Sequence, residues 1–427
     1  MVERTLTVES VRKPGVRVRR FLRRQFAEVS KGGVIVLSRK VGVLVAMAVL
    51  FPIALLLWLL ERWVVVRFVP LFSERIGHFA ATTEIYLCER DAGINVPRPR
   101  SFDVPYYGSP ASNSQLKKMW DRTLRIWPFV MAHRLHRLSR LLPRADIHEV
   151  RLAEARDVHG LLARTAAHLA FTQEEERAGW AALRELGLPE GVPFICFHAR
   201  DSAYLNAVYP KNDWSYHDYR DSSIHSYLPA VEELSKRGYF AVRMGSIVKE
   251  PLRTSAPRII DYATIGKRTD FLDVFLAAKC RFFLSSGNGI DAVAMIFRRP
   301  LIYVNLVPLE RATTWLPDHL FIPKKHWLRD EHRFLTFREI LESGVGRFLH
   351  SEQYAAHGIE LIENTPEEIA ALAIEMDERL KGTWRTTEED EELQRRFWSL
   401  YPPSELHGVI VSRIGAEFLR QNRDLLA

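Results

Sequence analysis

The sequence predicts an α/β protein in which two Rossmann-like domains follow an N-terminal hydrophobic helix. Three observations predict this class. Residues 279–305 have the pattern of a strand, a glycine turn, a helix and a second strand. Short apolar runs alternate with helical patterns from residue 194 onward, which is the order of a parallel, nucleotide-type sheet. Residues 41–60 form a run of twenty residues without a charge.

Composition shifts and loop signals divide the chain into four parts. They are a basic tail with a membrane-anchor helix (1–62), an N-terminal Rossmann-like domain (63–188), a C-terminal Rossmann-like domain (189–382), and C-terminal helices that could pack back on the N-terminal domain (383–427).

The net charge is unevenly distributed. The chain of 427 residues has 47% hydrophobic and 26% charged residues, so it is globular in composition and long enough for two cores. Its net charge is +8, but residues 1–40 alone hold 11 Lys or Arg and 3 Glu, so the rest of the chain sums to zero. We therefore expect no nucleic-acid partner, and expect the basic tail to contact anionic lipid.

Residues 41–60 have the length of a membrane helix, with Arg39 and Arg62 close to its two ends. A buried core helix is the alternative. Basic residues on both flanks argue against exporting the rest of the chain, and Pro52 is expected to break the helix. The sequence therefore predicts a bent, re-entrant or interfacial anchor that leaves both ends in the cytoplasm.

The N-terminal Rossmann-like domain begins with the strand-like run 64–71. Gly77 and His78 follow at a turn before a helix expected over 82–89, which would direct the histidine into a crevice. The other expected elements are a proline-rich loop and strand (93–110), an amphipathic segment (115–142), a helix (174–186) and an interdomain linker (189–193).

The C-terminal Rossmann-like domain alternates strands and helices. Gly238 ends one helix and Pro300 stops another, as is usual for these residue types. The strands are expected near 194–201, 239–245, 258–262, 282–284 and 301–304, and the helices at 224–237, 270–278 and 290–297. Beyond this domain we expect a capped helix over 365–380 and a final helix over 410–426.

The turn of small residues after the strand at 282–284 is the candidate anion site. In a doubly wound sheet such a turn lies at the carboxyl end of a strand, where the free N–H groups of the next helix bind anions. A phosphate or diphosphate is the expected ligand, although similar turns occur in α/β proteins without any ligand. The turn residues are Ser285, Ser286, Gly287, Asn288 and Gly289.

Arg200, Arg220 and Arg243 lie at or just after the ends of elements in the same domain. A guanidinium group suits a diphosphate because it is planar, always charged and able to donate paired hydrogen bonds. The alternative for each arginine is a salt bridge, with Asp201, Asp221 or Asp261 as the partner. Three arginines beside one helix N-terminus favour the anion.

His78 and His198 are the candidates for a general base, with Asp201 as an alternative. A structural hydrogen-bonding role is the competing interpretation for either histidine. The sequence has no Asp-x-Asp motif, and Cys88, Cys196 and Cys280 lack metal-binding spacing, so we expect chemistry without a metal or another cofactor.

Several of these motifs, in this order, resemble a family of bacterial glycosyltransferases from surface-polysaccharide gene clusters. The resemblance covers about residues 65–425 and excludes the hydrophobic helix. It is carried by the segments 75–78, 197–201, 219–224, 238–245, 261–262, 270–273, 282–289, 299–300 and 363–369. The strand end at His198 and Arg200, with the Ser-Ser-Gly turn, is also distantly similar to the nucleotide-binding half of fucosyltransferase-type GT-B enzymes.

The likeness to these enzymes implies a GT-B fold, in which two Rossmann-like domains face a cleft. It also implies that Arg200 and the backbone of residues 285–289 hold the diphosphate of a sugar nucleotide. The fucosyltransferase pattern has two adjacent arginines, whereas Asp201 follows Arg200 here, which puts GDP-fucose in doubt as the donor. Gly77 and His78 are similar to the glycine-histidine turn of plant-type GT-B transferases, whose histidine is the base.

The resemblance therefore implies a membrane-anchored hexosyl- or deoxyhexosyltransferase in cell-surface glycan biosynthesis. It would take a nucleotide-sugar donor and a lipid-linked or polysaccharide acceptor, at the cytoplasmic face of a bacterial inner membrane. Two alternatives remain: a nucleotide-sugar epimerase-type enzyme, against which the lack of a GxGxxG motif argues, and a non-catalytic scaffold for polysaccharide assembly.

Overall fold

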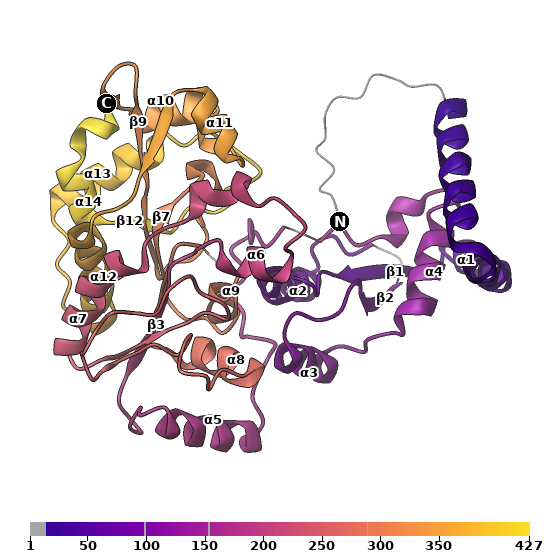
Figure 1. The fold of residues 1–427 in the computed structure, drawn as a ribbon, viewed down its shortest axis with the longest axis horizontal. Helices are drawn as coiled ribbons and strands as arrows, with labels where there is room; N and C mark the ends of the chain where they lie inside the picture. Colours follow the sequence, from indigo (N-terminus) through magenta and orange to yellow (C-terminus); the bar gives the residue numbers. More distant parts are fainter. Residues whose placement is uncertain (1–13, 98–99, 153, 288) are drawn as a thin grey trace. The chain divides into compact units, whose positions relative to one another are not determined.

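The computed structural model describes residues 14–97, 100–152, 154–287 and 289–427 (Figure 1). The chain forms two compact units, each assembled from separated stretches of sequence. Unit 1 comprises the residues up to 69 together with 97–106 and 127–150, and unit 2 comprises 70–96, 107–126 and 151–427. Residues 63–188, which the sequence analysis assigned to one domain, are thus shared between the two units.

The hydrophobic helix of unit 1 is α1 (Pro14–Leu59). Its backbone leaves helical geometry at Gly33, where φ is 58° and ψ is −151°, a conformation that glycine adopts readily because it has no Cβ. Pro52 lies inside the helix, which continues on both sides of it. The prediction that Pro52 breaks the helix is therefore wrong, and the break falls at Gly33 instead. Proline removes a single N–H donor, and this helix tolerates that loss.

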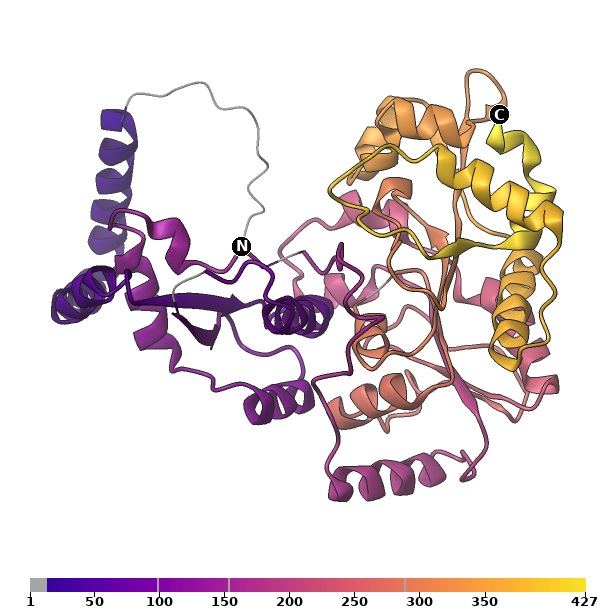
Figure 2. The same cartoon turned by 180° about the vertical axis from the view of Figure 1, so that it is seen from behind.

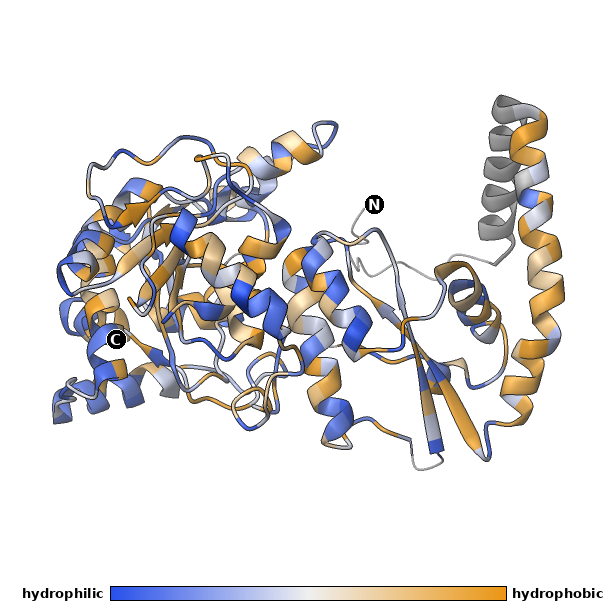
Figure 3. Ribbon diagram, turned by 90° about the horizontal axis from the view of Figure 1, so that it is seen from below, coloured by the Kyte–Doolittle hydropathy of each residue, from blue (hydrophilic) through white to orange (hydrophobic). Residues whose placement is uncertain are grey.

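The part of α1 from Gly33 to Leu59 is long and apolar enough to cross a membrane. Its 18-residue window has a mean hydropathy of 2.6, and 6% of that window is buried. Figure 3 shows this segment as a long helix of mostly hydrophobic residues. By length and composition it is a candidate membrane span.

The rest of unit 1 is a small α/β layer. Strands β1 (Val64–Leu71) and β2 (Arg100–Tyr107) pair in a two-stranded sheet, and α4 (Phe129–Ser139) packs on α1. A buried cluster of Phe68, Val104, Tyr106 and Ala132 joins the sheet to α4, and Leu57 of α1 packs against it. The expected strand at 64–71 is confirmed.

Unit 2 is built on a seven-stranded sheet whose neighbouring strands are all parallel. The strand order is β12-β8-β7-β6-β3-β4-β5. The strands are β3 (Phe194–His198), β4 (Phe240–Arg243), β5 (Ile259–Ile260), β6 (Phe283–Ser285), β7 (Leu301–Leu306), β8 (His319–Pro323) and β12 (Arg413–Ile414). Near-continuous apolar runs form these strands because helices cover both faces of the sheet.

Helices lie on both faces of this sheet, as Figures 1 and 2 show from opposite sides. On one face lie α7 (Leu228–Lys236) and α12 (Pro366–Lys381), and on the other α8 (Asp270–Lys279) and α9 (Asp291–Ile296). The mixed α/β fold with a parallel sheet is therefore confirmed. The further helices of unit 2 are α2 (Ile76–Asp91), α3 (Ser114–Thr123), α5 (Gln173–Glu185), α6 (Ala203–Val208), α10 (Phe337–Glu342), α11 (Ser351–Ala356), α13 (Glu388–Ser399) and α14 (Ala416–Gln421).

Two features of unit 2 were not predicted from the sequence: the strand β12 and a second, antiparallel sheet. The final helix expected over 410–426 is shorter, because Arg413 and Ile414 form β12 beside β8. A second sheet, with strand order β10-β9-β11, adds a small antiparallel layer. Its strands are β9 (Lys325–Leu328), β10 (Arg333–Phe334) and β11 (Ile359–Ile362).

Within the described part of residues 63–188, the strands are β1 and β2, so we find no multi-stranded Rossmann-like sheet there. The amphipathic segment 115–142 is divided between α3 and α4, with a break ahead of Pro128. The helix α3 is fastened to α8, because the Asn113 amide donates to the Asp270 carbonyl at 3.0 Å.

A buried ionic network ties α2 to the end of α9. Glu84 is fully buried, and its carboxylate accepts a hydrogen bond from Arg298 at 2.7 Å. His168 lies 3.2 Å from the same carboxylate and 3.0 Å from that of Asp91. Contact with Cys88, and then with Glu84, raises the pKa of His168 to about 10. His168 is therefore an imidazolium at neutral pH, and its charge helps to compensate the buried Glu84.

Replacing His168 with Gln should lower the stability of the chain below pH 7. The raised pKa means that this contribution is complete below pH 6.5 and is lost as the pH rises toward 10. We expect His168→Gln to cost roughly 3 kcal/mol at pH 6 and to flatten the pH dependence between pH 7 and pH 10. Urea unfolding in detergent at several pH values measures both effects.

The control for that experiment is His225→Gln, because His225 forms a solvent-exposed pair with Glu250 and should contribute little. If the two variants have the same pH dependence, the network does not hold a charged His168.

Candidate functional site

The site lies at the carboxyl edge of the parallel sheet in unit 2. The pairing register places His198, the last residue of β3, opposite Ser285 at the end of β6. Phe197 is opposite Arg243 at the end of β4. The loops that follow these strands therefore leave the sheet side by side, which is where ligands bind in open α/β sheets.

Arg200 is buried beside the small-residue turn. Its backbone N–H donates to Ser286 Oγ at 3.0 Å, and its Nη1 donates to the His217 carbonyl at 3.0 Å and to the Asp221 carboxylate. The salt-bridge alternative thus holds for one edge of this guanidinium. Its Nε and Nη2 donors form no hydrogen bond with the described residues, and they remain for an anion.

Positive charge converges around His217. Burial, followed by repulsion from Arg200, Arg220 and Arg75, lowers the pKa of His217 to about 4. Burial and then the charge of Arg220 likewise lower the pKa of Arg200. Like charges this close are unfavourable unless an anion joins them. Asp221 provides part of this compensation, and burial raises the pKa of its carboxyl to about 6.

The turn after β6 is held by its own side chains. Ser285 Oγ donates to Asp291 at 2.6 Å and accepts from the Gly287 N–H at 3.1 Å. Arg220 Nη2 donates to the Gly287 carbonyl at 2.5 Å. The expectation that the Gly287 amide is free for a diphosphate is therefore wrong in this structure, because the Ser285 hydroxyl occupies it. Asn288 lies outside the described residues.

A close approach of two backbones brings His78 to this turn. A Cβ on Gly77 would lie 3.0 Å from Gly289 Cα, and a Cβ on Gly289 would lie 3.2 Å from the Gly77 nitrogen. Only glycine fits without movement on either side. The N-terminus of α2 therefore lies against the turn that precedes α9, and both belong to unit 2.

His78 is the third residue of α2, within the helix and not in the turn before it. Its side chain is half-buried, with Nδ1 3.4 Å from Thr82 Oγ1 and its ring edge-on to Phe72. Burial, and then the charge of Arg75, lowers the pKa of His78. The ring is therefore neutral at neutral pH, which is the form a general base requires.

Three of the predicted residues have structural partners. Arg243 is buried, donates to the Glu250 carbonyl at 2.8 Å and pairs with Asp261 at 3.3 Å. The carboxylate of Asp201 accepts from the backbone N–H groups of Ala203 and Lys249, at 2.9 and 3.0 Å. Burial lowers the pKa of His198 to about 4. These contacts fix the loops around the site.

A pocket of about 450 Å³ opens at the same edge of the sheet. Asp201 and Arg243 line it, together with Asp221, Lys324 and Glu363. Lys324, which the sequence alone did not reveal as a site residue, is buried and donates to the Asp221 carbonyl at 2.7 Å. The available signal was its position directly after the apolar run of β8, since polar residues that follow strands face this edge.

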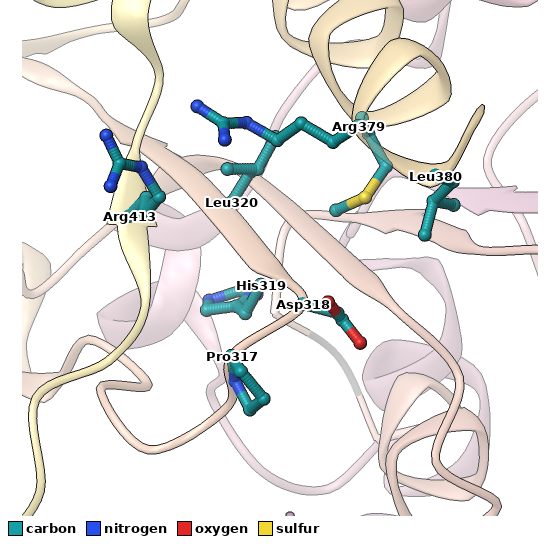
Figure 4. Close-up of a pocket in the computed structure, with 8 residues that line it drawn as sticks. Pro317, Asp318, His319, Leu320, Arg379, Leu380 and Arg413 are labelled. Carbon is teal, nitrogen blue, oxygen red and sulfur yellow. The ribbon is translucent and has the colours of Figure 1, made fainter. Parts of the chain in front are cut away.

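Two other clusters of polar side chains lie outside this site. A smaller pocket of about 140 Å³ is lined by Arg379 of α12, Arg413 of β12 and His319 of β8 (Figure 4). Its arginines already pair with Glu375 and Glu391.

Glu84, Cys88 and His168 gather three potential metal ligands within 4.8 Å. Arg298 donates to the same Glu84 carboxylate, and both ring nitrogens of His168 face carboxylates. A guanidinium group therefore supplies the positive charge that a metal ion would bring, and we assign the cluster a structural role.

No protein-family model and no curated protein sequence matches the chain. Several solved structures are similar to it, and three of them are described here. They are a glycosyl transferase family 9 structure from Veillonella parvula (11% identity, 74% of this chain and 96% of that chain, TM-score 0.40), ADP-heptose lipopolysaccharide heptosyltransferase II from Escherichia coli (12%, 56% and 84%, 0.29), and a UDP-N-acetylglucosamine 2-epimerase-like structure from Listeria monocytogenes (11%, 76% and 98%, 0.23). Because these TM-scores are below 0.5, the function proposed below rests on the residues of this chain.

Gly77→Ala tests the contact between the two backbones. Alanine normally stabilises a helix relative to glycine, but here its Cβ would meet Gly289 at 3.0 Å. We expect a net loss of about 1 to 2 kcal/mol from overpacking, measured as a lower melting temperature. Gly42→Ala is the matched control, because a Cβ at Gly42 meets nothing within 4 Å. A Gly77→Ala variant as stable as the wild type would mean that the two segments are not in contact.

Proposed function

We propose that the chain is a glycosyltransferase that moves a sugar from a nucleotide-sugar donor to a lipid-linked or polysaccharide acceptor. The observation that carries the proposal is the convergence of Arg75, Arg200 and Arg220 on His217 beside the turn after β6. A diphosphate bound there would compensate charges that Asp221 compensates only in part. The transferred group would be a hexosyl or deoxyhexosyl unit.

The same charges would assist the reaction. Negative charge builds on the leaving nucleoside diphosphate as the glycosidic bond to the donor breaks, so guanidinium groups stabilise the transition state more than the ground state. Arg200 would use its Nε and Nη2 donors for this, while Arg220 holds the turn through Gly287. This route needs no metal ion, and we propose a metal-independent reaction.

His78 is the proposed base. Its neutral ring would accept the proton of the acceptor hydroxyl as that oxygen attacks the sugar, which implies inversion at the anomeric carbon. The contact between Gly77 and Gly289 supports this role because it holds the N-terminus of α2 against the diphosphate turn. Asp201 is the weaker candidate, since both its oxygens accept backbone N–H groups.

The pocket of about 450 Å³ beside Asp221 supports a nucleoside site. Its volume lies within the range of about 300 to 1,000 Å³ that is typical of small-molecule sites. Lys324 and Glu363 offer polar groups there. In the GT-B arrangement that we propose, the acceptor lies on the N-terminal part of the chain. The apolar segment Gly33–Leu59 would hold the enzyme at the cytoplasmic face of a bacterial inner membrane.

Two contacts favour the scaffold alternative. Arg200 pairs with Asp221, and Ser285 occupies the Gly287 amide, so part of the cradle is satisfied without a ligand. A non-catalytic protein for polysaccharide assembly would show these contacts and would bind no sugar nucleotide.

Arg200→Ala distinguishes the two functions. The full chain in detergent is titrated with GDP-, UDP-, CMP- and dTDP-sugars, and its melting temperature is measured. For a transferase we expect one nucleotide class to raise the melting temperature, and Arg200→Ala to weaken its binding about 10- to 100-fold, because hydrogen bonds to charged groups contribute about 1.5 to 3 kcal/mol.

Arg253→Ala is the control for charge alone, since Arg253 is exposed and pairs with none of the described residues. If no sugar nucleotide stabilises the wild-type chain, the transferase proposal fails and the scaffold is favoured.

The pH profile of kcat/KM tests His78. Because its pKa is lowered, the acidic limb should fall below pH 6.5. Removing the positive charge with Arg75→Gln should raise the pKa and move the limb to higher pH, whereas removing the negative charge with Glu74→Gln should move it lower. His78→Ala should reduce the rate by about 100-fold or more. A limb that neither charge variant moves would mean that another group is the base.

A further inference from the structure

The positive charge of the chain belongs to unit 1. Its three stretches contain nineteen Lys or Arg and seven Asp or Glu, a net charge of +12, whereas unit 2 has a net charge of −4. The excess is not confined to the tail, because α4 and the residues after it contribute Arg134, Arg137, Arg140 and Arg144. A surface of this sign beside an apolar helix fits a membrane that contains anionic lipid.

One face of α4 combines basic and apolar side chains. Val130, Arg134 and Arg137 follow one another at intervals of four and three residues, which places them on one side of α4, and Leu141 follows two residues after the helix ends at Ser139. Val130 is 56% exposed and Leu141 is 71% exposed. Arg134 and Arg137 form no ion pair with the described residues. This is the pattern of a helix that lies at a bilayer surface, with apolar residues entering and arginines reaching headgroups.

The position of α4 within unit 1 fits this role. Leu57, near the end of α1, packs against the cluster that contains Ala132 of α4. Two residues beyond α1, Glu61 pairs with Arg144 at 2.7 Å, and Trp63 is 66% exposed. The end of a helix embedded in a bilayer lies at headgroup level, where tryptophan is enriched. The contacts with Leu57 and Glu61 therefore hold α4 at that level.

We propose that α4 and the turn after it form a second membrane contact, in which Arg134 and Arg137 bind anionic phospholipid headgroups while Val130 and Leu141 enter the interface. The proposal rests on the membrane position proposed above for residues 33–59. It adds that the bilayer orients unit 1 through a surface as well as through the apolar helix. A membrane of anionic lipid is favoured over an acidic protein because this surface is continuous with the apolar helix.

Single cysteine labels on the full chain test this contact. Cys88, Cys196 and Cys280 are all buried, so an introduced surface cysteine can be labelled selectively with an environment-sensitive fluorophore. The variants are Leu141→Cys for α4, Val45→Cys for the apolar helix and Ile265→Cys as an exposed control in unit 2. Each is reconstituted in vesicles of phosphatidylcholine, with or without phosphatidylglycerol, that carry a spin-labelled lipid as quencher.

We expect the labels at 45 and 141 to be quenched and the label at 265 to remain unquenched. Quenching at 141 should be stronger with phosphatidylglycerol. Adding the double substitution Arg134→Gln and Arg137→Gln should weaken the surface contact about 30-fold, from about 1 kcal/mol for each basic residue near anionic lipid. The matched double substitution Arg329→Gln and Arg338→Gln, at exposed arginines of unit 2, should have no effect.

The outcomes separate this proposal from the one on which it rests. Quenching at 45 but not at 141, or quenching at 141 that ignores both lipid charge and the double substitution, overturns the α4 contact and leaves the apolar helix in the membrane. Quenching at neither position overturns both proposals. Sugar transfer is not needed for any of these readouts.

Discussion

The contact between Gly77 and Gly289 is the constraint on which the candidate site depends. A Cβ on either glycine would collide with the backbone of the other. The backbones of α2 and of the segment before α9 can approach this closely because neither residue has a side chain. This approach sets His78 beside the turn that follows β6. It also places Arg75, the N-cap residue of α2, near enough to His217 to lower the pKa of that histidine. Side chains of ordinary size at either position would separate the charges that define the site.

The electrostatics of the site are those of an incompletely neutralised cluster. Arg200, Arg220 and Arg75 act on the same histidine, and Asp221 is the nearest compensation for Arg200. Burial raises the pKa of the Asp221 carboxyl to about 6, because desolvation outweighs the attraction of Arg200. An anion with more charge and more oxygen atoms could replace this carboxylate with a gain in electrostatic energy. The pairing of Arg200 with Asp221 is thus compatible with the diphosphate site that we propose.

The sequence predicted the parallel sheet well and the first half of the chain less well. The strands from β3 to β7 follow from short apolar runs between glycine and proline signals, because buried parallel strands leave a local pattern. The same pattern predicted that Arg200 and the turn at residues 285–289 lie at the same edge of the sheet. Arg413 and Ile414 were expected in a helix, since two residues are too few to show a strand periodicity before β8 provides a neighbour.

Other features depend on contacts between distant residues and leave no local signal. The Arg298 guanidinium donates a hydrogen bond to Glu84, which is 214 residues away in the sequence. The hydrogen-bond partners of Arg243 and Asp201 also include residues of loops that the local sequence does not identify. Lys324 was the one missed residue with a usable signal, its position after a buried strand. The expected break at Pro52 shows the limit of a rule based on residue type, because the backbone turned at Gly33, where nothing but flexibility marked the site.

The break at Gly33 separates two stretches of α1 with different solvent preferences. Before it the sequence is rich in arginine, and after it the chain is almost wholly apolar. A straight helix across both stretches would place either guanidinium groups in an apolar environment or leucine side chains in water. With the break at Gly33, the two stretches can point in different directions. In the membrane position that we propose for residues 33–59, the basic stretch could then lie along the phosphate layer while the apolar stretch enters the hydrocarbon.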